Sequence, residues 1–89
     1  MIVPIIHMNG TSPDRLCEAL SDVYYSASQL MEVLKQSAPN GRDYYPMPGL
    51  FDKACEQHRA RMQSVTDLQA SIEKEIEGIM EQTAKGGVS

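Results

Sequence analysis

The sequence lacks the features that mark a membrane-spanning, secreted or nucleic-acid-binding protein. It has no tryptophan, one phenylalanine and only two cysteines, too few for a disulfide framework. Its longest apolar stretch, residues 1–6, is interrupted by Pro4 and is too short for a membrane span or a signal peptide. The net charge of −4 disfavours general nucleic-acid binding, because phosphate contacts need a basic surface. We therefore expect a single small domain, residues 1–89, located in the cytoplasm.

Motifs for catalysis or metal binding are also missing. There is no nucleophile next to a base, no glycine-rich phosphate loop and no cluster of metal ligands, so we expect no enzyme, no cofactor and no metal. The glutamates at 73, 75, 77 and 81 surround Lys74 and are interpreted as a solvated helix face. His58 is interpreted as a histidine of a helix seam that is hydrogen-bonded across the structure; a metal or catalytic role would need further ligands.

What the sequence does contain is two long stretches with helical periodicity. The first begins after Ser12-Pro13-Asp14, a helix-start signal, and ends before Pro39. Its apolar positions are spaced alternately by four and three: Leu16, Leu20, Val23, Ala27, Leu30 and Leu34, flanked by Cys17, Tyr24 and Met31. The second stretch has the same spacing throughout: Phe51, Cys55, His58, Met62, Val65, Gln69, Ile72, Ile76, Ile79 and Thr83. We predict helices over 13–38 and 48–82.

Two helices joined by one loop predict an all-α fold, a long antiparallel helical hairpin. Residues 1–11 are expected to form a short extended arm, either as an edge strand or laid on a helix, and residues 83–89 a frayed tail. If the chain turns near residue 43, the numbers of two residues that face each other across the hairpin add up to about 86. Cys17 would then face residue 69 and Cys55 residue 31, so the two cysteines lie roughly 21 Å apart along the helix axis. Both cysteines are then small core residues.

The predicted hairpin leaves much of each seam uncovered. The second helix is longer by about nine residues, an overhang of roughly 13 Å that the N-terminal arm is expected to cover in part. A second copy of the chain is expected to cover the remaining apolar surface, so we predict a homo-oligomer that forms a helical bundle. The oligomer number stays open, because the seams mix several apolar residue types.

The loop over residues 39–49 carries more chemistry than a helix connection needs. It holds Asn40, Arg42, Asp43, Tyr44 and Tyr45, residue types suited to anion recognition and stacking. The alternative is structural, with Asp43 and Arg42 capping helix ends and the tyrosines closing the bundle. Residues 35–61 carry a net charge of +2 and the rest of the chain −6, so an anionic ligand would be steered toward the loop.

Two segments resemble a family of small uncharacterised proteins from tailed bacteriophages and prophages. They are His7-Met8-Asn9-Gly10-Thr11-Ser12 and Ala38-Pro39-Asn40-Gly41-Arg42-Asp43-Tyr44-Tyr45, and Gln57-His58-Arg59-Ala60-Arg61 fits the same pattern. The resemblance covers most of residues 5–80 and departs from the family at Met47-Pro48-Gly49, where a glutamine and a glycine are usual. It implies a phage-encoded accessory protein of the bacterial cytoplasm, with no established activity.

These observations favour a binding protein that acts stoichiometrically. It would serve counter-defence by sequestering a small anionic, nucleotide-like signal or by blocking a host protein. The candidate contact residues are Asn40, Arg42, Asp43, Tyr44, Tyr45, His7, Asn9, Thr11 and His58. They need not meet within one chain, and an oligomer interface could unite them. The alternative function is a structural or assembly role for the coiled-coil seams.

Overall fold

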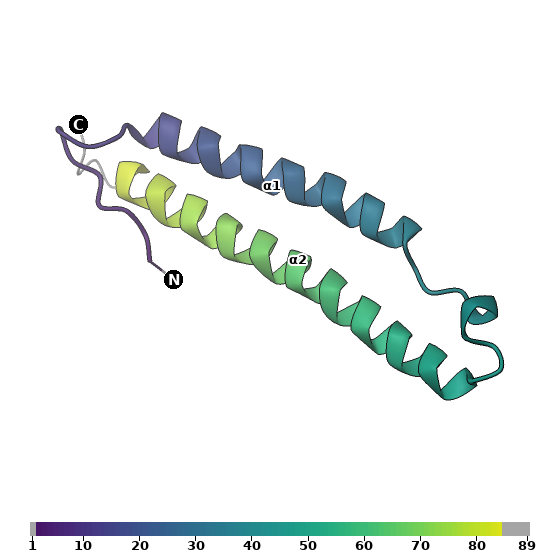
Figure 1. Ribbon diagram of the computed structural model, residues 1–89. Helices are drawn as coiled ribbons and strands as arrows, with labels where there is room; N and C mark the ends of the chain where they lie inside the picture. The colour runs from purple at the N-terminus through teal and green to yellow at the C-terminus, as the bar shows by residue number, and fades with distance from the viewer. Residues whose placement is uncertain (1, 85–89) are drawn as a thin grey trace.

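The computed structural model describes residues 2–84, which form two long antiparallel helices joined by a loop (Figure 1). Helix α1 spans Pro13–Gln36, a short 3-10 helix η1 spans Gly41–Tyr44, and helix α2 spans Pro48–Ala84. Residues 2–84 contain no strand, which confirms the all-helical hairpin. The molecule is elongated: its radius of gyration is 19.2 Å, against about 12 Å for a compact domain of this length. Neither helix in this range has a stretch long and apolar enough to cross a bilayer.

The helix ends lie where local chemistry predicts them, to within two residues. Ser12 caps α1, its side chain accepting a hydrogen bond from the Arg15 backbone N–H at 3.3 Å, and Pro13 occupies the first turn. At the other end, the Ser37 N–H and hydroxyl both donate to the Leu34 carbonyl oxygen, at 2.9 and 2.7 Å. These bonds end α1 before the predicted residue 38. Helix α2 includes the first two residues of the predicted frayed tail, and residues 85–89 lie outside the described part.

The core is a narrow seam between the two helices and the arm. Among residues 2–84, five apolar side chains are buried: Ile6, Ala27, Val65, Ile72 and Ile79. The three on α2 are seven residues apart, as a heptad seam requires. Every position of the predicted α2 seam is buried or half-buried except Thr83, which is exposed.

The seam of α1 differs from the prediction by one position at two sites. Val23 and Leu30 remain 46% and 49% exposed, whereas Tyr24 and Met31 are half-buried. The contacting positions are therefore Leu20, Tyr24, Ala27, Met31 and Leu34, which also alternate by four and three. Both sets fit helical periodicity, and only the contact with α2 selects between them.

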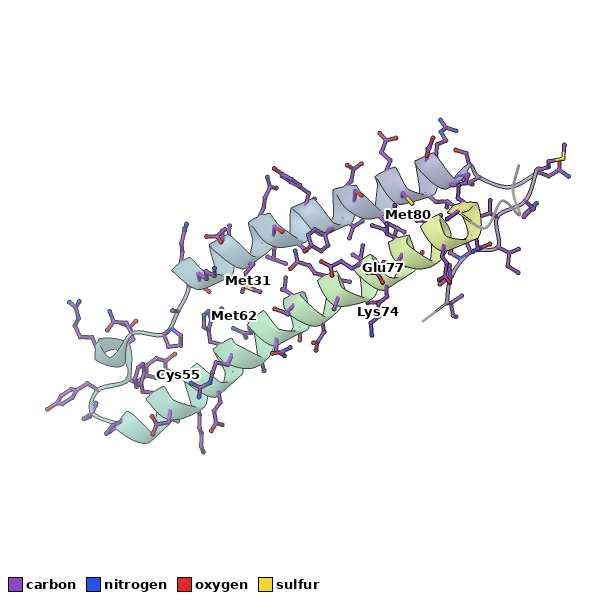
Figure 2. The ribbon with its side chains drawn as sticks, turned by 180° about the vertical axis from the view of Figure 1, so that it is seen from behind. Met31, Cys55, Met62, Lys74, Glu77 and Met80 are labelled. Carbon is purple, nitrogen blue, oxygen red and sulfur yellow. The ribbon has the colours of Figure 1, made fainter. Side chains whose placement is uncertain are left out.

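The two helices are paired in a different register from the predicted one. The Gln69 side-chain amide donates to the Tyr24 carbonyl oxygen at 3.1 Å and to the Ser28 hydroxyl at 2.8 Å, so facing residues sum to 93–97 rather than to 86. Met31 and Met62, which sum to 93, accordingly point from the two helices into the space between them (Figure 2).

This register also changes the place of the cysteines. Cys17 lines a pocket with Ile79 and Met80 instead of facing residue 69. Cys55 is 24 positions before Ile79 on α2, so the two thiols lie roughly 36 Å apart along the axis, further than predicted. Both are free and half-buried, as expected for small seam residues rather than a redox pair.

The overhang of α2 lies at the loop end of the hairpin. In the observed register, Gln36 at the end of α1 is level with about residue 59 of α2, so α2 extends past α1 toward the loop (Figure 1). The loop folds back on this part: the rings of Tyr44 and Phe51 pack with centroids 6.0 Å apart. The prediction that the N-terminal arm covers the overhang is therefore wrong.

The N-terminal arm packs within its own chain, at the other end of α2. The Gln82 side-chain amide donates to the Pro4 carbonyl oxygen at 2.8 Å and accepts from the Ile6 N–H at 3.1 Å. Gly78 provides room beside it, because a Cβ there would lie 3.0 Å from both methyl carbons of Val3. Of the two predicted arrangements for the arm, the structure has the extended segment laid on a helix.

Candidate functional site

The loop between the helices is held in shape by its own hydrogen bonds. The Asn40 side-chain oxygen accepts from the Arg42 N–H at 3.0 Å, and the Asn40 backbone carbonyl oxygen accepts from the Asp43 N–H at 3.0 Å, which starts η1. The Met47 N–H then donates to the Tyr44 carbonyl oxygen at 2.7 Å. Asn40 therefore has a structural role as the cap of η1. The loop conformation depends on internal contacts and on Tyr44, which is half-buried against Phe51.

Four of the five predicted loop residues are exposed, and only Tyr44 is half-buried. The exposed side chain of Asn40 is used as the cap of η1, whereas Arg42, Asp43 and Tyr45, which is 86% exposed, are directed to the outside. Within residues 2–84, neither the Arg42 guanidinium nor the Asp43 carboxylate has a hydrogen-bond or ion-pair partner. A guanidinium, a carboxylate and a phenol ring thus stand free on an ordered backbone. This set can form charge-assisted hydrogen bonds and stack on a flat ligand.

The electrostatic setting of the loop is mildly basic. The loop end carries Lys35, Arg42, Lys53, Arg59 and Arg61 against three carboxylates, a net charge of +2. Lys35 already contacts Glu32 at 3.3 Å, an exposed pair one turn apart that contributes little to stability. Arg42 is the basic residue of loop 39–49, and its guanidinium remains available to an anion.

The candidates His7, Asn9 and Thr11 are exposed at the opposite end of a molecule that is 65 Å long. Here the Gly10 N–H donates to the His7 carbonyl oxygen at 3.1 Å, which forms a turn. The His7 ring lies over Gly10, where a Cβ would come within 2.8 Å of its Nε2 atom. The structure thus brings the loop candidates together and the arm candidates together, but one chain does not unite the two groups.

His58 belongs to the half-buried seam of α2 rather than to either group. In the observed register it is level with Ser37, just past the end of α1. No residue in 2–84 hydrogen-bonds to its imidazole, so the predicted bond across the hairpin is absent from the described part of the chain. Nor do the described residues contain a group of three or more histidine, cysteine, aspartate or glutamate side chains that could hold a metal ion.

Sequence reasoning missed an apolar pocket at the arm end of the hairpin. Its volume is about 300 Å³, and it is lined by Pro13, Asp14, Cys17, Ile79, Met80, Thr83 and Ala84. The pocket exists because the start of α1 is level with the end of α2. A register in which facing residues sum to 86 does not place these segments together, so the sequence offered no signal for it.

The polar contacts between the helices were also not predicted. Besides the Gln69 bonds, Tyr24 of α1 is coupled to Glu73 of α2. Hydrogen bonding to the Glu73 carboxylate, together with its negative charge, raises the pKa of Tyr24 above its ordinary value of 10.0, with a smaller contribution from burial. Tyrosine and glutamate positions that flank a seam gave no sign of this pairing, because it depends on the register.

The fold and the loop together define an elongated helical hairpin with a preformed polar surface at one end. No protein-family model matches the chain, and no curated protein or solved structure is significantly similar to it. The resemblance to a phage protein family therefore stays a prediction from the two sequence motifs.

Proposed function

We propose that this chain is a non-enzymatic binding protein whose contact surface is the outer face of the loop. The observation that carries the proposal is the unpaired set of Arg42, Asp43 and Tyr45 on a backbone fixed by Asn40 and by Tyr44. An ordered loop loses little conformational entropy on binding, which favours affinity. A surface with a guanidinium and an exposed ring, but with no nucleophile and base beside it, suits binding rather than turnover.

The proposed ligand is a small anion of nucleotide type, or an acidic patch on a host protein. Arg42 supplies a fork that fits phosphate or carboxylate oxygens, and Tyr45 supplies a face for stacking. The phage resemblance adds the biological setting: an accessory protein that counters host defence by sequestering a signal in the bacterial cytoplasm. Stoichiometric binding needs no catalytic group.

The proposal includes a homo-oligomer, supported by apolar side chains exposed along one flank of the hairpin. Val23 and Leu30 each precede a seam residue of α1 by one position, and Leu68 does the same beside Gln69 on α2. Because Tyr24, Gln69 and Glu73 meet on one flank of the seam, these three share the other flank, where they are 46–49% exposed. We name Val23, Leu30 and Leu68 the apolar flank.

The position of the apolar flank favours an antiparallel pair of hairpins. In the observed register all three side chains lie close to the middle of α2, so a two-fold axis there would align two copies over their full length. The net +2 loop end of one copy would then meet the strongly acidic end of the other. Such a pair would bring His7, Asn9 and Thr11 of one chain toward the loop of its partner.

Native mass spectrometry of protein purified from bacterial cells tests the binding proposal. We expect a discrete oligomer that carries extra mass, and we expect a mild denaturing step to release that mass as a small anionic molecule. The variants Arg42→Ala and Tyr45→Ala should lose the extra mass and keep helicity and assembly. Arg59→Ala, at an exposed arginine of the same basic end, is the matched control and should retain it.

An oligomer that carries no extra mass would indicate a protein target instead of a small anion. Affinity capture from host lysate with the same three variants would then identify which residues the target contacts.

Tyr44→Ala is expected to disturb the loop itself, because the Tyr44 ring packs on Phe51. Loss of binding in that variant alone, with Arg42→Ala unaffected, would contradict a contact role for the loop.

The alternative function, a structural or assembly protein, is favoured by the heptad regularity of α2. It predicts that loop variants remain active, whereas charges on the apolar flank abolish function. Assays of both sets of variants in infected cells therefore distinguish the two functions.

A further inference from the structure

Arg61 and Glu75 lie on either side of Leu68 along α2. Each is seven positions from Leu68, so the three side chains lie along one face of the helix, the face of the apolar flank. Leu68 is 47% exposed, Arg61 is exposed and Glu75 is half-buried. Within residues 2–84, neither the Arg61 guanidinium nor the Glu75 carboxylate has a hydrogen-bond or ion-pair partner. A basic, an apolar and an acidic side chain at equal spacing make this face complementary to itself when it is turned end for end.

A two-fold axis at Leu68 aligns this face with its copy. In an antiparallel pair of α2 helices whose axis passes Leu68, the numbers of two facing residues add up to 136. Leu68 then meets the partner's Leu68. Arg61 meets the partner's Glu75, because 61 and 75 also add up to 136. The symmetry repeats that contact, so two ion pairs enclose one apolar contact.

The α1 part of the apolar flank fits the same axis. Val23 faces the partner's Leu30 if the axis passes midway between the two positions, at 26.5. Position 26.5 of α1 and position 68 of α2 add up to 94.5, which is inside the range of 93–97 observed for facing residues within the hairpin. One axis therefore pairs apolar side chains on both helices and opposite charges on α2.

Other alignments of two copies match this face poorly. A slide that changes the sum on α2 by seven places Leu68 against Arg61, with a sum of 129, or against Glu75, with a sum of 143. Either slide covers a charge with an apolar side chain and gives it no opposite charge. A parallel pair would join two acidic ends: residues 1–22 and 73–84 carry seven acidic and two basic side chains, a net charge of −5. Like charges brought together at an interface weaken association.

We infer that a second copy of this chain binds antiparallel across this face, and that reciprocal Arg61–Glu75 ion pairs fix its alignment. The inference rests on the assembly included in the proposed function and identifies the residues that direct it. The same axis brings Gly78 and Gln82, which contact the N-terminal arm, level with residues 58 and 54 of the partner. Those residues belong to the overhang, which α1 leaves uncovered beside the loop.

Charge reversal in the full-length chain tests this alignment. Arg61→Glu places two glutamates at each contact and Glu75→Arg places two arginines there, so each variant alone should associate about tenfold more weakly than the native chain. An equimolar mixture of the two variants should associate as tightly as the native chain, because a mixed pair has a glutamate facing an arginine at both contacts. Sedimentation equilibrium at low salt measures the association constants. Native mass spectrometry counts the mixed pairs, because the two variants differ in mass.

The matched control is the combination of Arg59→Glu and Glu77→Arg. These two positions also add up to 136, but each is nine positions from Leu68, two and a half turns, and so lies on the opposite side of α2. Both side chains are exposed. The control variants should associate like the native chain and show no preference for mixed pairs.

The inference is overturned if mixing Arg61→Glu with Glu75→Arg gains nothing over the single variants, or if the control pair shows an equal preference. With a native chain that is dimeric, this result removes the alignment and leaves the assembly standing. A monomeric native chain overturns the alignment and the assembly together, whereas release of bound mass from the loop variants is measured separately. Circular dichroism verifies the helical content of each variant, and Glu75→Lys replaces Glu75→Arg should the larger side chain prevent folding.

Discussion

At the scale of single residues, three side-chain amides hold this molecule together where its apolar core is thin. Asn40 starts η1, Gln69 joins the two helices, and Gln82 fixes the arm. Gln82 pairs with the carbonyl of Pro4 and the N–H of Ile6, much as a neighbouring strand would. An amide suits this task, because it offers a donor and an acceptor in one plane.

Gly78 provides a residue-scale prediction about the arm. Gly78→Ala should gain up to about 1 kcal/mol of helix stability, but the new Cβ would press on Val3 at 3.0 Å. We expect the gain to be small in the native background and close to complete in a Val3→Ala background. Urea unfolding of the four members of this double-mutant cycle gives the coupling. Equal gains in both backgrounds would show that the arm does not rest on Gly78.

At the scale of the elements, the seam of α2 contributes most of the burial. Ile79 is fully buried, with 0% of its surface exposed, whereas Val33 of α1 is 61% exposed. Ile79 is also near the arm and the start of α1, so its removal affects three segments at once.

Ile79→Ala should therefore lower the free energy of unfolding by roughly 2–5 kcal/mol, the usual cost of emptying a buried isoleucine site. A loss of this size is a large fraction of the stability of a small domain. Val33→Ala is the control, and its effect should stay within about 0.5 kcal/mol. Urea denaturation followed by circular dichroism measures both. Similar losses for the two variants would mean that the helices do not pack along the α2 seam.

The Tyr24–Glu73 pair predicts how the hairpin responds to alkaline pH. The pKa of Tyr24 is raised in the folded chain, so the native state holds this proton more tightly than the unfolded state. The stability that the pair contributes is fully present below pH 10 and is lost as the pH rises through the folded pKa. Thermal melts between pH 8 and 11 should show a decline that is shallower in Tyr24→Phe. Identical pH profiles for the two proteins would exclude the pairing.

At the scale of the whole molecule, two helices alone leave an incomplete core. The exposed apolar flank is the surface that the proposed second copy would cover. A charge at Ile72 would not test assembly, because this side chain is buried within one chain and its replacement would unfold the hairpin.

The double variant Leu30→Glu, Leu68→Glu tests assembly better, because both side chains are about half exposed in the single chain. We expect the native chain to be an oligomer and the variant to be a helical monomer, measured by size-exclusion chromatography with light scattering. Tyr25→Glu is the control, since Tyr25 is exposed on the side of α1 away from the seam. An unchanged mass in the double variant would assign the interface elsewhere, and a monomeric native chain would end the assembly proposal.

The sequence by itself determined the features that depend on nearby residues. Caps, prolines and turn pairs are local, so both helices are found within two residues of their predicted ends. The heptad spacing of α2 predicted its buried face, and the polar loop residues were found because they exceed what a connection requires. The sequence did not separate the structural Tyr44 from the exposed Arg42, Asp43 and Tyr45, because that division depends on packing against Phe51.

Tertiary structure decided the features that depend on how the two helices meet. The face of α1, the position of the overhang, the pocket beside Cys17 and the arm contact with Gln82 all follow from one register. A repeat of seven residues allows several registers with similar apolar packing, so periodicity cannot choose among them. In the observed register Gln69 meets Ser28, more than forty positions away in the sequence, and a contact of this kind exists only once the chain has folded.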